Sequence, residues 1–266
     1  LAAEHVVRRD PDGVMVVLLA DHYISDPQEF RKCLAAAIEA AKTGEWVVTI
    51  GIKPSRPETG YGYIRQGDKW KEINGLPVFY ADGFREKPAM EKALRYLRDG
   101  GYLWNSGMFV WRVDLLKHLL RLFLPDLFRS LEVIGKSLGT PNETEVLTSE
   151  YQKLPKISID YGVMEKCDQV LVVPATFGWD DVGSWAALER HREVNDQGNI
   201  IEAEGVFLDT RGCVVHAPKR VVATMGIEDL IIVDGADALL VCHKERASEL
   251  KRLVEGLKAA GYEHLV

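Results

Sequence analysis

The sequence contains no apolar run long enough to cross a membrane as a helix. Its most apolar segment, VMVVLLA, covers only residues 14–20, whereas a membrane-spanning helix needs about 20 residues. The first dozen residues carry Arg-Arg-Asp where a secretory signal would have its apolar core. We therefore expect a cytoplasmic protein with no membrane partner.

Paired cysteines and an excess of basic residues are also missing. The cysteines are widely scattered and form no C-x-x-C pair, which favours reduced, mostly buried thiols over a metal site or a disulfide framework. They are Cys33, Cys167, Cys213 and Cys242. A net charge of −7 argues against nucleic acid as a partner, because such proteins present a basic face. An anionic substrate would need local positive charge, from a few side chains or a bound metal.

The first two thirds of the chain alternate apolar strands with helical segments. Residues 14–20 and 46–52 are typical of buried strands, and the helix between them begins with Asp26 as its cap and Pro27 in its first turn. A strand, a helix and a strand in this order predict parallel pairing with a right-handed crossover. Further strands are expected at 78–84, 104–112 and 169–175, and helices at 89–98, at 115–131 with a break at Pro125, at 144–153 and at 184–193.

The pattern changes near Asn195. Short strands there alternate with glycine-containing turns every eight to ten residues, and one amphipathic helix closes the chain. This spacing predicts a small β-sheet or β-helix module. We therefore expect an α/β domain over residues 1–194 and a β-rich module over residues 195–266.

Candidate site residues fall where predicted strands end or begin, which is where open α/β sheets bind ligands. Asp21 follows a strand and could hold a divalent metal, or it could be a solvated strand end. Glu86 could accept hydrogen bonds from sugar hydroxyls and Lys87 could hold a phosphate, although a surface salt-bridged turn explains the pair equally well. Asn105 offers an amide next to Gly107, or simply a turn.

Two further stretches offer weaker signals. The Tyr61-Gly62 pair would let the backbone approach a ligand beside an aromatic ring, but a β-bulge is an equal explanation. Asp160 precedes a short helical turn that it could simply cap.

The stretch FGWDDVGSW at 177–185 places Asp180 and Asp181 just before a predicted helix. Either acid could cap that helix. Capping needs only one of them, however, and it leaves the flanking Trp179 and Trp185 unexplained.

Taken together, these stretches closely resemble the mannose-1-phosphate guanylyltransferases, or GDP-mannose pyrophosphorylases, of the sugar-nucleotidyltransferase superfamily. The matching segments are LADHYI (19–24), SRPETGYGYI (55–64), FREKP (84–88), WNSGMFVW (104–111), SIDYGVMEK (158–166), FGWDDVGSW (177–185) and the tail at 222–245. They follow one another in the family's order over nearly the whole chain.

The resemblance implies an α/β fold, a Rossmann-like nucleotide-diphospho-sugar transferase domain with a mixed, mostly parallel sheet, followed by a β-helix-like segment. It implies GTP and mannose 1-phosphate as substrates, and leaves a homodimer open. It further implies the site residues. Asp21 and Asp181 would hold a catalytic Mg²⁺, Lys87 the sugar phosphate, Glu86 and Asn105 the mannose hydroxyls, and Gly62 the sugar through its backbone; Tyr61 lies alongside as a substrate-binding residue, and Asp160 belongs to a shared motif. Asp180 would be a solvated or capping neighbour.

One departure from the family pattern is large. The N-terminal glycine-rich loop, whose Arg and Lys bind the nucleotide triphosphate in the family, does not occur in this sequence, which begins at Leu1. We therefore expect a fragment that lacks part of its nucleotide site.

Two other functions remain open: transfer to a different hexose 1-phosphate, such as glucose 1-phosphate, and non-catalytic sensing of a nucleotide sugar. A sensor should have lost the metal-binding carboxylates, whereas Asp21 and Asp181 are both present.

Overall fold

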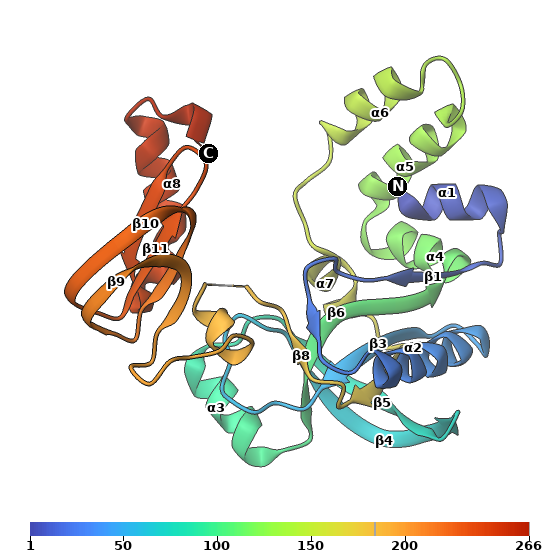
Figure 1. Cartoon of the computed structure of the whole chain (residues 1–266). Helices are drawn as coiled ribbons and strands as arrows, with labels where there is room; N and C mark the ends of the chain where they lie inside the picture. The colour runs from blue at the N-terminus through green and yellow to red at the C-terminus, as the bar shows by residue number, and fades with distance from the viewer. Residues whose placement is uncertain (184, 266) are drawn as a thin grey trace. The chain divides into compact units, whose positions relative to one another are not determined.

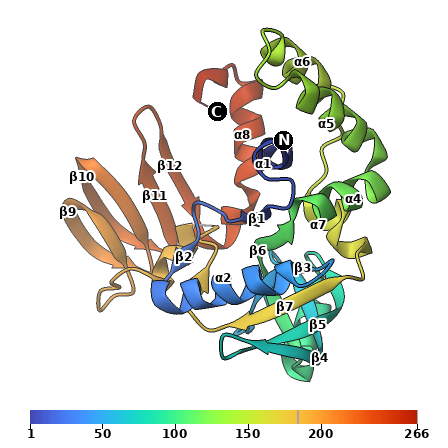
Figure 2. The same ribbon diagram turned by 90° about the vertical axis from the view of Figure 1, so that its right-hand side faces the viewer.

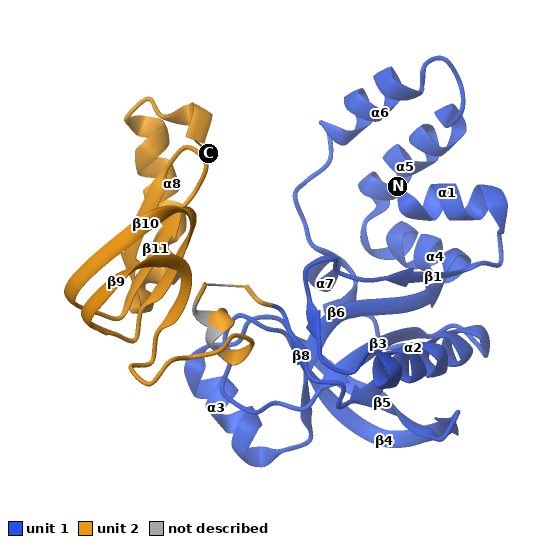
Figure 3. Cartoon of the chain, viewed as in Figure 1, with its two compact units in different colours: residues 1–181 blue, residues 182–266 orange. Residues whose placement is uncertain are grey.

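The structure is a computed structural model that describes residues 1–183 and 185–265. The chain divides into two compact units, Leu1–Asp181 and Val182–Val266 (Figure 3). The domain boundary after residue 194 stays a prediction. Ser184, where the sequence predicts a helix to begin, lies outside the described residues, and a 3₁₀ helix, η2 (Trp185–Arg190), follows it.

The first unit is built on a six-stranded sheet with the order β1-β6-β3-β7-β5-β4. Its strands are β1 (Val14–Val17), β3 (Val47–Ile52), β4 (Tyr63–Ile73), β5 (Leu76–Arg85), β6 (Tyr102–Arg112) and β7 (Val170–Ala175). The predicted mixed sheet is confirmed. The expectation that it is mostly parallel is wrong, because among these strands only β3 and β7 pair in parallel, while β6 pairs antiparallel with β1, β3 and β4, and β5 with β4 and β7.

Direct pairing between the first two predicted strands is also wrong, because β6 lies between β1 and β3. The burial of each strand explains this order. β6 is buried along most of its length and suits a central position, whereas β1 is only half-buried and ends at Val17, with Leu18 and Leu19 exposed. A strand with one exposed side belongs at the edge of a sheet.

The helices of the first unit confirm most of the predicted ones. They are α1 (Ala2–Arg9), α2 (Pro27–Lys42), α3 (Met90–Asp99), α4 (Val113–Phe123), α5 (Pro125–Ser137), α6 (Glu143–Tyr151) and α7 (Ile159–Gly162), with the 3₁₀ turn η1 (Met164–Lys166). The predicted cap holds, since the side chain of Asp26 accepts hydrogen bonds from the backbone of Gln28 and Glu29. Pro125 separates α4 from α5 as expected.

Side chains that alternate along the central strands belong to two separate hydrophobic cores. Val48 and Ile50 of β3 pack on α2, where Cys33 is fully buried. Val47 and two aromatic side chains of β6, Phe109 and Trp111, pack instead among α1, α4 and α5. Figures 1 and 2 show these three helices together, apart from α2. The sheet is thus covered on both faces, which leaves strand ends and loops as the places for a site.

The predicted burial of the thiols is confirmed for two of the four cysteines. Cys33 and Cys213 are buried, Cys167 and Cys242 are half-buried, and all four are free. Burial raises the pKa of the Cys33 thiol to about 11. In the described part of the chain, no helix is both long and apolar enough to cross a bilayer.

The second unit contains a four-stranded sheet in the order β12-β11-β10-β9. Its elements are β9 (Ile200–Arg211), β10 (Val214–Glu228), β11 (Leu230–Asp234), β12 (Leu239–His243), η3 (Lys244–Glu249), α8 (Leu250–Ala259) and η4 (Glu263–Leu265). β9, β10 and β11 are parallel neighbours although only a few residues connect them. Such short connections between parallel strands require the chain to coil, so the predicted β-helix-like module is confirmed.

Asn199 ties successive turns of this coil together. Its side chain is buried, donates to the carbonyl of Thr210 at 2.7 Å and accepts from the backbone of Cys213 at 2.8 Å. We expect Asn199→Ala to lower the free energy of unfolding by about 2–4 kcal/mol, because two buried backbone groups lose their partners. Urea unfolding followed by circular dichroism measures this change.

Asn195→Ala is the matched control. Asn195 also accepts two backbone hydrogen bonds, but it is exposed, so water can replace its oxygen. Equal losses from the two variants would contradict a special role for the buried amide.

Candidate functional site

The site is organised around an opening between two strands. β3 ends with Ile52 opposite Trp104 of β6, and β4 begins with Tyr63 opposite the same residue. The segment 53–62 therefore leaves the sheet and returns to it at one point of β6. Its last two residues, Tyr61 and Gly62, are buried beside that point.

Gly62 lies against two of the predicted site residues. Its carbonyl accepts a hydrogen bond from the backbone of Asn105 at 2.8 Å. A Cβ added at Gly62 would lie 2.5 Å from Oε2 of Glu86 and 3.2 Å from Cβ of Asn105. A side chain at position 62 would therefore displace the carboxylate of Glu86, and three residues from separate segments meet at one point.

The side chain of Asn105 is held on both its polar atoms. Its Nδ2 donates to Oδ1 of Asp160 at 3.1 Å. Its Oδ1 accepts from the hydroxyl of Thr49 at 3.3 Å and from the backbone of Gly107 at 3.2 Å. The structure thus joins Asp160 to the same group. The alternative of a helix cap is met by Ser158, whose hydroxyl accepts from the backbone of Tyr161.

Charge is concentrated in this group, which we call the Gly62 cluster (Gly62, Glu86, Lys87, Asn105 and Asp160). Nζ of Lys87 lies 3.6 Å from Oε1 of Glu86. Burial, and then the charge of Asp160, raises the pKa of Glu86, against the lowering effect of Lys87. Burial also raises the pKa of Asp160, opposed by its hydrogen bond from Asn105 and by Lys87. Two acids held close together beside an exposed lysine suit recognition of hydroxyls next to an anion.

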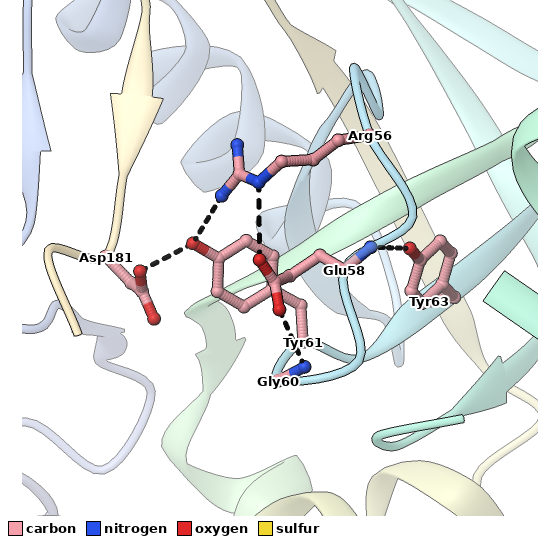
Figure 4. Close-up of polar contacts among 6 residues, drawn as sticks. All are labelled: Arg56, Glu58, Gly60, Tyr61, Tyr63 and Asp181. Atoms are coloured by element: carbon pink, nitrogen blue, oxygen red, sulfur yellow. Dashed lines mark hydrogen bonds and ion pairs between the residues drawn. The ribbon is translucent and has the colours of Figure 1, made fainter. Parts of the chain in front are cut away.

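A second group lies next to the first, which we call the Asp181 cluster (Arg56, Glu58, Tyr61 and Asp181). The hydroxyl of Tyr61 donates to Oδ1 of Asp181 at 2.5 Å, and Nη2 of Arg56 donates to the same hydroxyl at 3.3 Å (Figure 4). Burial and the bond to Asp181 raise the pKa of Tyr61, so its hydroxyl keeps its proton. The two clusters are continuous because Tyr61 directly precedes Gly62.

Asp21 approaches Asp181 through a short strand pair. β2 (Tyr23–Ile24) pairs antiparallel with β8 (Trp179–Asp180), with Tyr23 opposite Asp180. The chain just beyond this pair carries His22 on one side and Asp181 on the other. Nδ1 of His22 accepts from Nε1 of Trp179 at 2.9 Å.

The pKa of His22 responds to the charges of both Asp21 and Asp181. Burial lowers its pKa, while the charges of Asp21, Asp181 and Asp180 act to raise it. The two predicted metal ligands therefore both lie close enough to act on one imidazole.

The two tryptophans of FGWDDVGSW belong to different units. Trp179 is half-buried and contacts the rings of His22 and Tyr61 edge-on. Trp185 packs in the core of the second unit, with Ile200, Val214 and Ile231. Asp180 is 4 % exposed within β8, so of the two roles expected for it the solvated one is wrong, while the capping one stays a prediction.

Sequence reasoning missed the residues that support Tyr61. Nε of Arg56 pairs with Oε2 of Glu58 at 3.3 Å, and the guanidinium lies over the ring of Trp104, 5.0 Å from its centroid. Arg56 and Glu58 both lie in SRPETGYGYI, so the segment was found but their contacts were not. A contact between residue 61 and residue 181 is not encoded in either segment alone.

The donor chemistry at this point suits a hard divalent cation. Asp21 and Asp181 offer carboxylate oxygens, which Mg²⁺ prefers. The described residues contain no group of three or more metal-ligating side chains. Two carboxylates are nevertheless sufficient for Mg²⁺ when substrate phosphates and water complete the shell.

Comparisons with known proteins identify the family of the chain. The family model described as Nucleotidyl transferase matches residues 1–197, and the model described as MannoseP isomerase/GMP-like beta-helix domain matches residues 203–257. A mannose-1-phosphate guanylyltransferase from Escherichia coli is 36% identical over 270 residues, covering 100% of this chain and 56% of the relative. The alginate biosynthesis protein AlgA from Pseudomonas aeruginosa is 36% identical over 262 residues, covering 98% of this chain and 54% of its own length.

A solved structure is similar over both units. It is described as a mannose-1-phosphate geranyltransferase from Thermus thermophilus, with a TM-score of 0.82 and 40% identity over 96% of this chain and 73% of that chain. The chain spans about half the length of the curated relatives that it matches.

Proposed function

This chain belongs to the nucleotidyl transferase family, and we propose that it takes part in transferring the GMP group of GTP to mannose 1-phosphate, giving GDP-mannose and pyrophosphate. The observation that carries the proposal is the meeting of the Gly62 cluster with the Asp181 cluster at one strand opening. A hydroxyl-binding group with a lysine lies directly beside a carboxylate suited to a cation. The names of the guanylyltransferase relatives support the choice of substrates.

The proposed reaction needs no protein nucleophile. Near neutral pH a sugar phosphate is mostly dianionic, since the second pKa of a phosphate monoester is about 6. One of its oxygens attacks the α-phosphorus of GTP, the bond from that phosphorus to the bridging oxygen breaks, and pyrophosphate leaves with the electron pair. The chain's task is to align the two anions and to offset their repulsion.

In this proposal the residues divide the work. Glu86 and Asn105 orient the mannose hydroxyls, and Asp160 holds the amide of Asn105 in place. Lys87, which is exposed, binds the sugar phosphate. Asp21 and Asp181 hold a divalent ion, proposed to be Mg²⁺; when bound, it would neutralise phosphate charge between the two substrates.

Product analysis tests the proposal. The full-length protein containing this chain is incubated with each of the four NTPs and with mannose 1-phosphate or glucose 1-phosphate, and nucleotide sugars are separated chromatographically. We expect GDP-mannose as the main product. Preference for glucose 1-phosphate would overturn the sugar assignment, and the absence of any nucleotide sugar would favour a sensor.

The raised pKa of Glu86 gives a pH-dependent prediction. Its folded-state pKa lies above the unfolded value, so the folded state binds more protons in the window between them. Stability therefore falls as pH rises through that window, and at pH 7 the ionised carboxylate destabilises the fold. We expect Glu86→Gln to raise Tm at pH 7, and the gain to vanish at acidic pH where Glu86 is protonated. The same variant should lower kcat/KM for mannose 1-phosphate, because an amide nitrogen replaces an acceptor oxygen.

Thermal unfolding between pH 4 and pH 8 provides the measurement. Glu91→Gln, on the exposed face of α3, is the control and should shift Tm little. A lower Tm for Glu86→Gln at pH 7 would contradict the electrostatic account.

A further inference from the structure

Asp181 is joined to a chain of side-chain hydrogen bonds that the Gly62 cluster does not include. Tyr61 donates to Oδ1 of Asp181, Arg56 donates to Tyr61, and Glu58 accepts from Arg56 (Figure 4). The proposed function uses Asp181 alone among these residues. The other three require a separate explanation.

We propose that Tyr61 and Arg56 are positioning residues that set the carboxylate of Asp181 for a divalent cation, with Glu58 as the anchor of Arg56. The proposal rests on the proposed function in one respect, namely that Asp181 is a metal ligand. It replaces the sequence-based expectation that Tyr61 binds substrate.

The direction of each hydrogen bond follows from the side-chain chemistry. A guanidinium has donors and no acceptor, so the oxygen of Tyr61 must accept from Arg56. A tyrosine hydroxyl has a single proton, and an ionised carboxylate only accepts. The proton of Tyr61 is therefore directed at Asp181, and the chain can be assembled in only one polarity.

The ring of Tyr61 cannot easily turn away. It is 7 % exposed and lies edge-on between Trp104 and Trp179, with centroids 5.2 and 5.1 Å away. Both indoles contact the ring and restrict its movement away from Asp181. The bond is thus fixed by packing as well as by charge.

Arg56 is tied to its own loop in the same manner. Glu58 accepts from Nε of Arg56 through Oε2 and from the backbone of Gly60 through Oε1, at 3.3 and 3.0 Å. The backbone N–H of Glu58 donates to the hydroxyl of Tyr63 on β4 at 3.0 Å. This second contact holds the backbone of the loop to the sheet and does not involve the side chains of Arg56, Tyr61 or Asp181.

Such support is useful only if the carboxylate can still bind a cation. A carboxylate has about four acceptor positions, so the bond from Tyr61 uses one of them. Residues that hydrogen-bond to a metal ligand without contacting the metal keep that ligand oriented, and their removal typically lowers metal affinity by about 10- to 100-fold. Tyr61 occupies this position relative to Asp181.

Mn²⁺ binding, measured by electron paramagnetic resonance of the free ion in the presence of the protein, tests the proposal without catalysis. We expect Tyr61→Phe to raise the Kd for Mn²⁺ by roughly 10-fold. In assays of the full-length protein, the Mg²⁺ concentration for half-maximal rate should rise while the KM for mannose 1-phosphate stays unchanged. A raised KM with unchanged Mn²⁺ affinity would return Tyr61 to substrate binding and overturn the proposal.

Tyr63→Phe is the matched control. It also removes a buried tyrosine hydroxyl with one hydrogen bond from the same loop, but this hydroxyl does not contact Asp181. Equal loss of Mn²⁺ affinity in both variants would show a general effect on the loop and overturn the specific role of Tyr61. Arg56→Lys should reduce Mn²⁺ affinity less than Tyr61→Phe does, because it leaves the hydrogen bond from Tyr61 to Asp181 in place. It removes only the guanidinium that donates to both Tyr61 and Glu58.

Asp181→Asn separates this proposal from the one on which it rests. If Asp181→Asn leaves Mn²⁺ affinity unchanged, the metal assignment itself fails. If Asp181→Asn weakens binding and Tyr61→Phe does not, only the positioning role fails. If both substitutions weaken Mn²⁺ binding, the double variant should bind Mn²⁺ no more weakly than Asp181→Asn alone. The reason is that Tyr61 acts on the cation only through Asp181.

Discussion

An Asp181→Asn variant of the full-length protein is expected to lose roughly three orders of magnitude in turnover, because a metal ion supplies several kcal/mol of charge stabilisation to phosphoryl transfer. The amide keeps the size of the side chain and can still accept from Tyr61. Its charge is what disappears, and with it the attraction for a divalent cation. Steady-state assays with GTP and mannose 1-phosphate measure the loss.

Asp168→Asn controls for the removal of an acid elsewhere in the same unit. Asp168 is an exposed residue of the same unit, and its loss should leave turnover unaltered. Circular dichroism should show Asp181→Asn folded, since the residue is only half-buried. Near-normal activity in a folded Asp181→Asn protein would remove Asp181 from the metal site.

The second large effect is expected from Gly62→Ala. The added methyl group would meet Oε2 of Glu86 at 2.5 Å and Cζ of Phe84 at 3.2 Å. Glu86 must then move, and displacement of a positioning group by about 1 Å can cost about 100-fold. We expect kcat/KM for mannose 1-phosphate to fall by about that factor, while Mn²⁺ affinity remains normal because Asp181 is not touched.

Gly60→Ala provides the comparison within the same loop. A Cβ at Gly60 meets only Oε1 of Glu58, at 3.4 Å, which is ordinary contact. Its backbone N–H, which donates to Glu58, is retained. If Gly60→Ala were as damaging as Gly62→Ala, loop stiffness rather than the space beside Glu86 would be the cause.

Local features of the fold were predictable where a single segment determines them. The cap at Asp26, the break at Pro125 and the buried strand at Val47–Ile52 each follow from residues adjacent in sequence. The position of β6 does not, because it depends on competition between distant strands for the centre of the sheet. The long, mostly buried β6 lies inside the sheet, and the half-buried β1 lies at its edge.

The candidate site shows the same division. The segments carrying Glu86, Asn105 and Asp160 could be named from the sequence, and the structure brings these residues together. The bond from Tyr61 to Asp181 could not be predicted, since it spans 120 positions and depends on where β2 and β8 meet. Residue types could be chosen in advance, whereas their partners required the tertiary fold.

The short β2–β8 pair has a consequence for the order of assembly. The hydrogen bond from Trp179 to His22 closes a separation of 157 residues, and contacts of such range form late because the intervening chain must first be ordered. During synthesis, almost the whole first unit is added to the chain between Asp21 and Asp181. If Asp21 and Asp181 hold a cation as proposed, that cation would bind only after the first unit is complete, and its binding would stabilise the folded state.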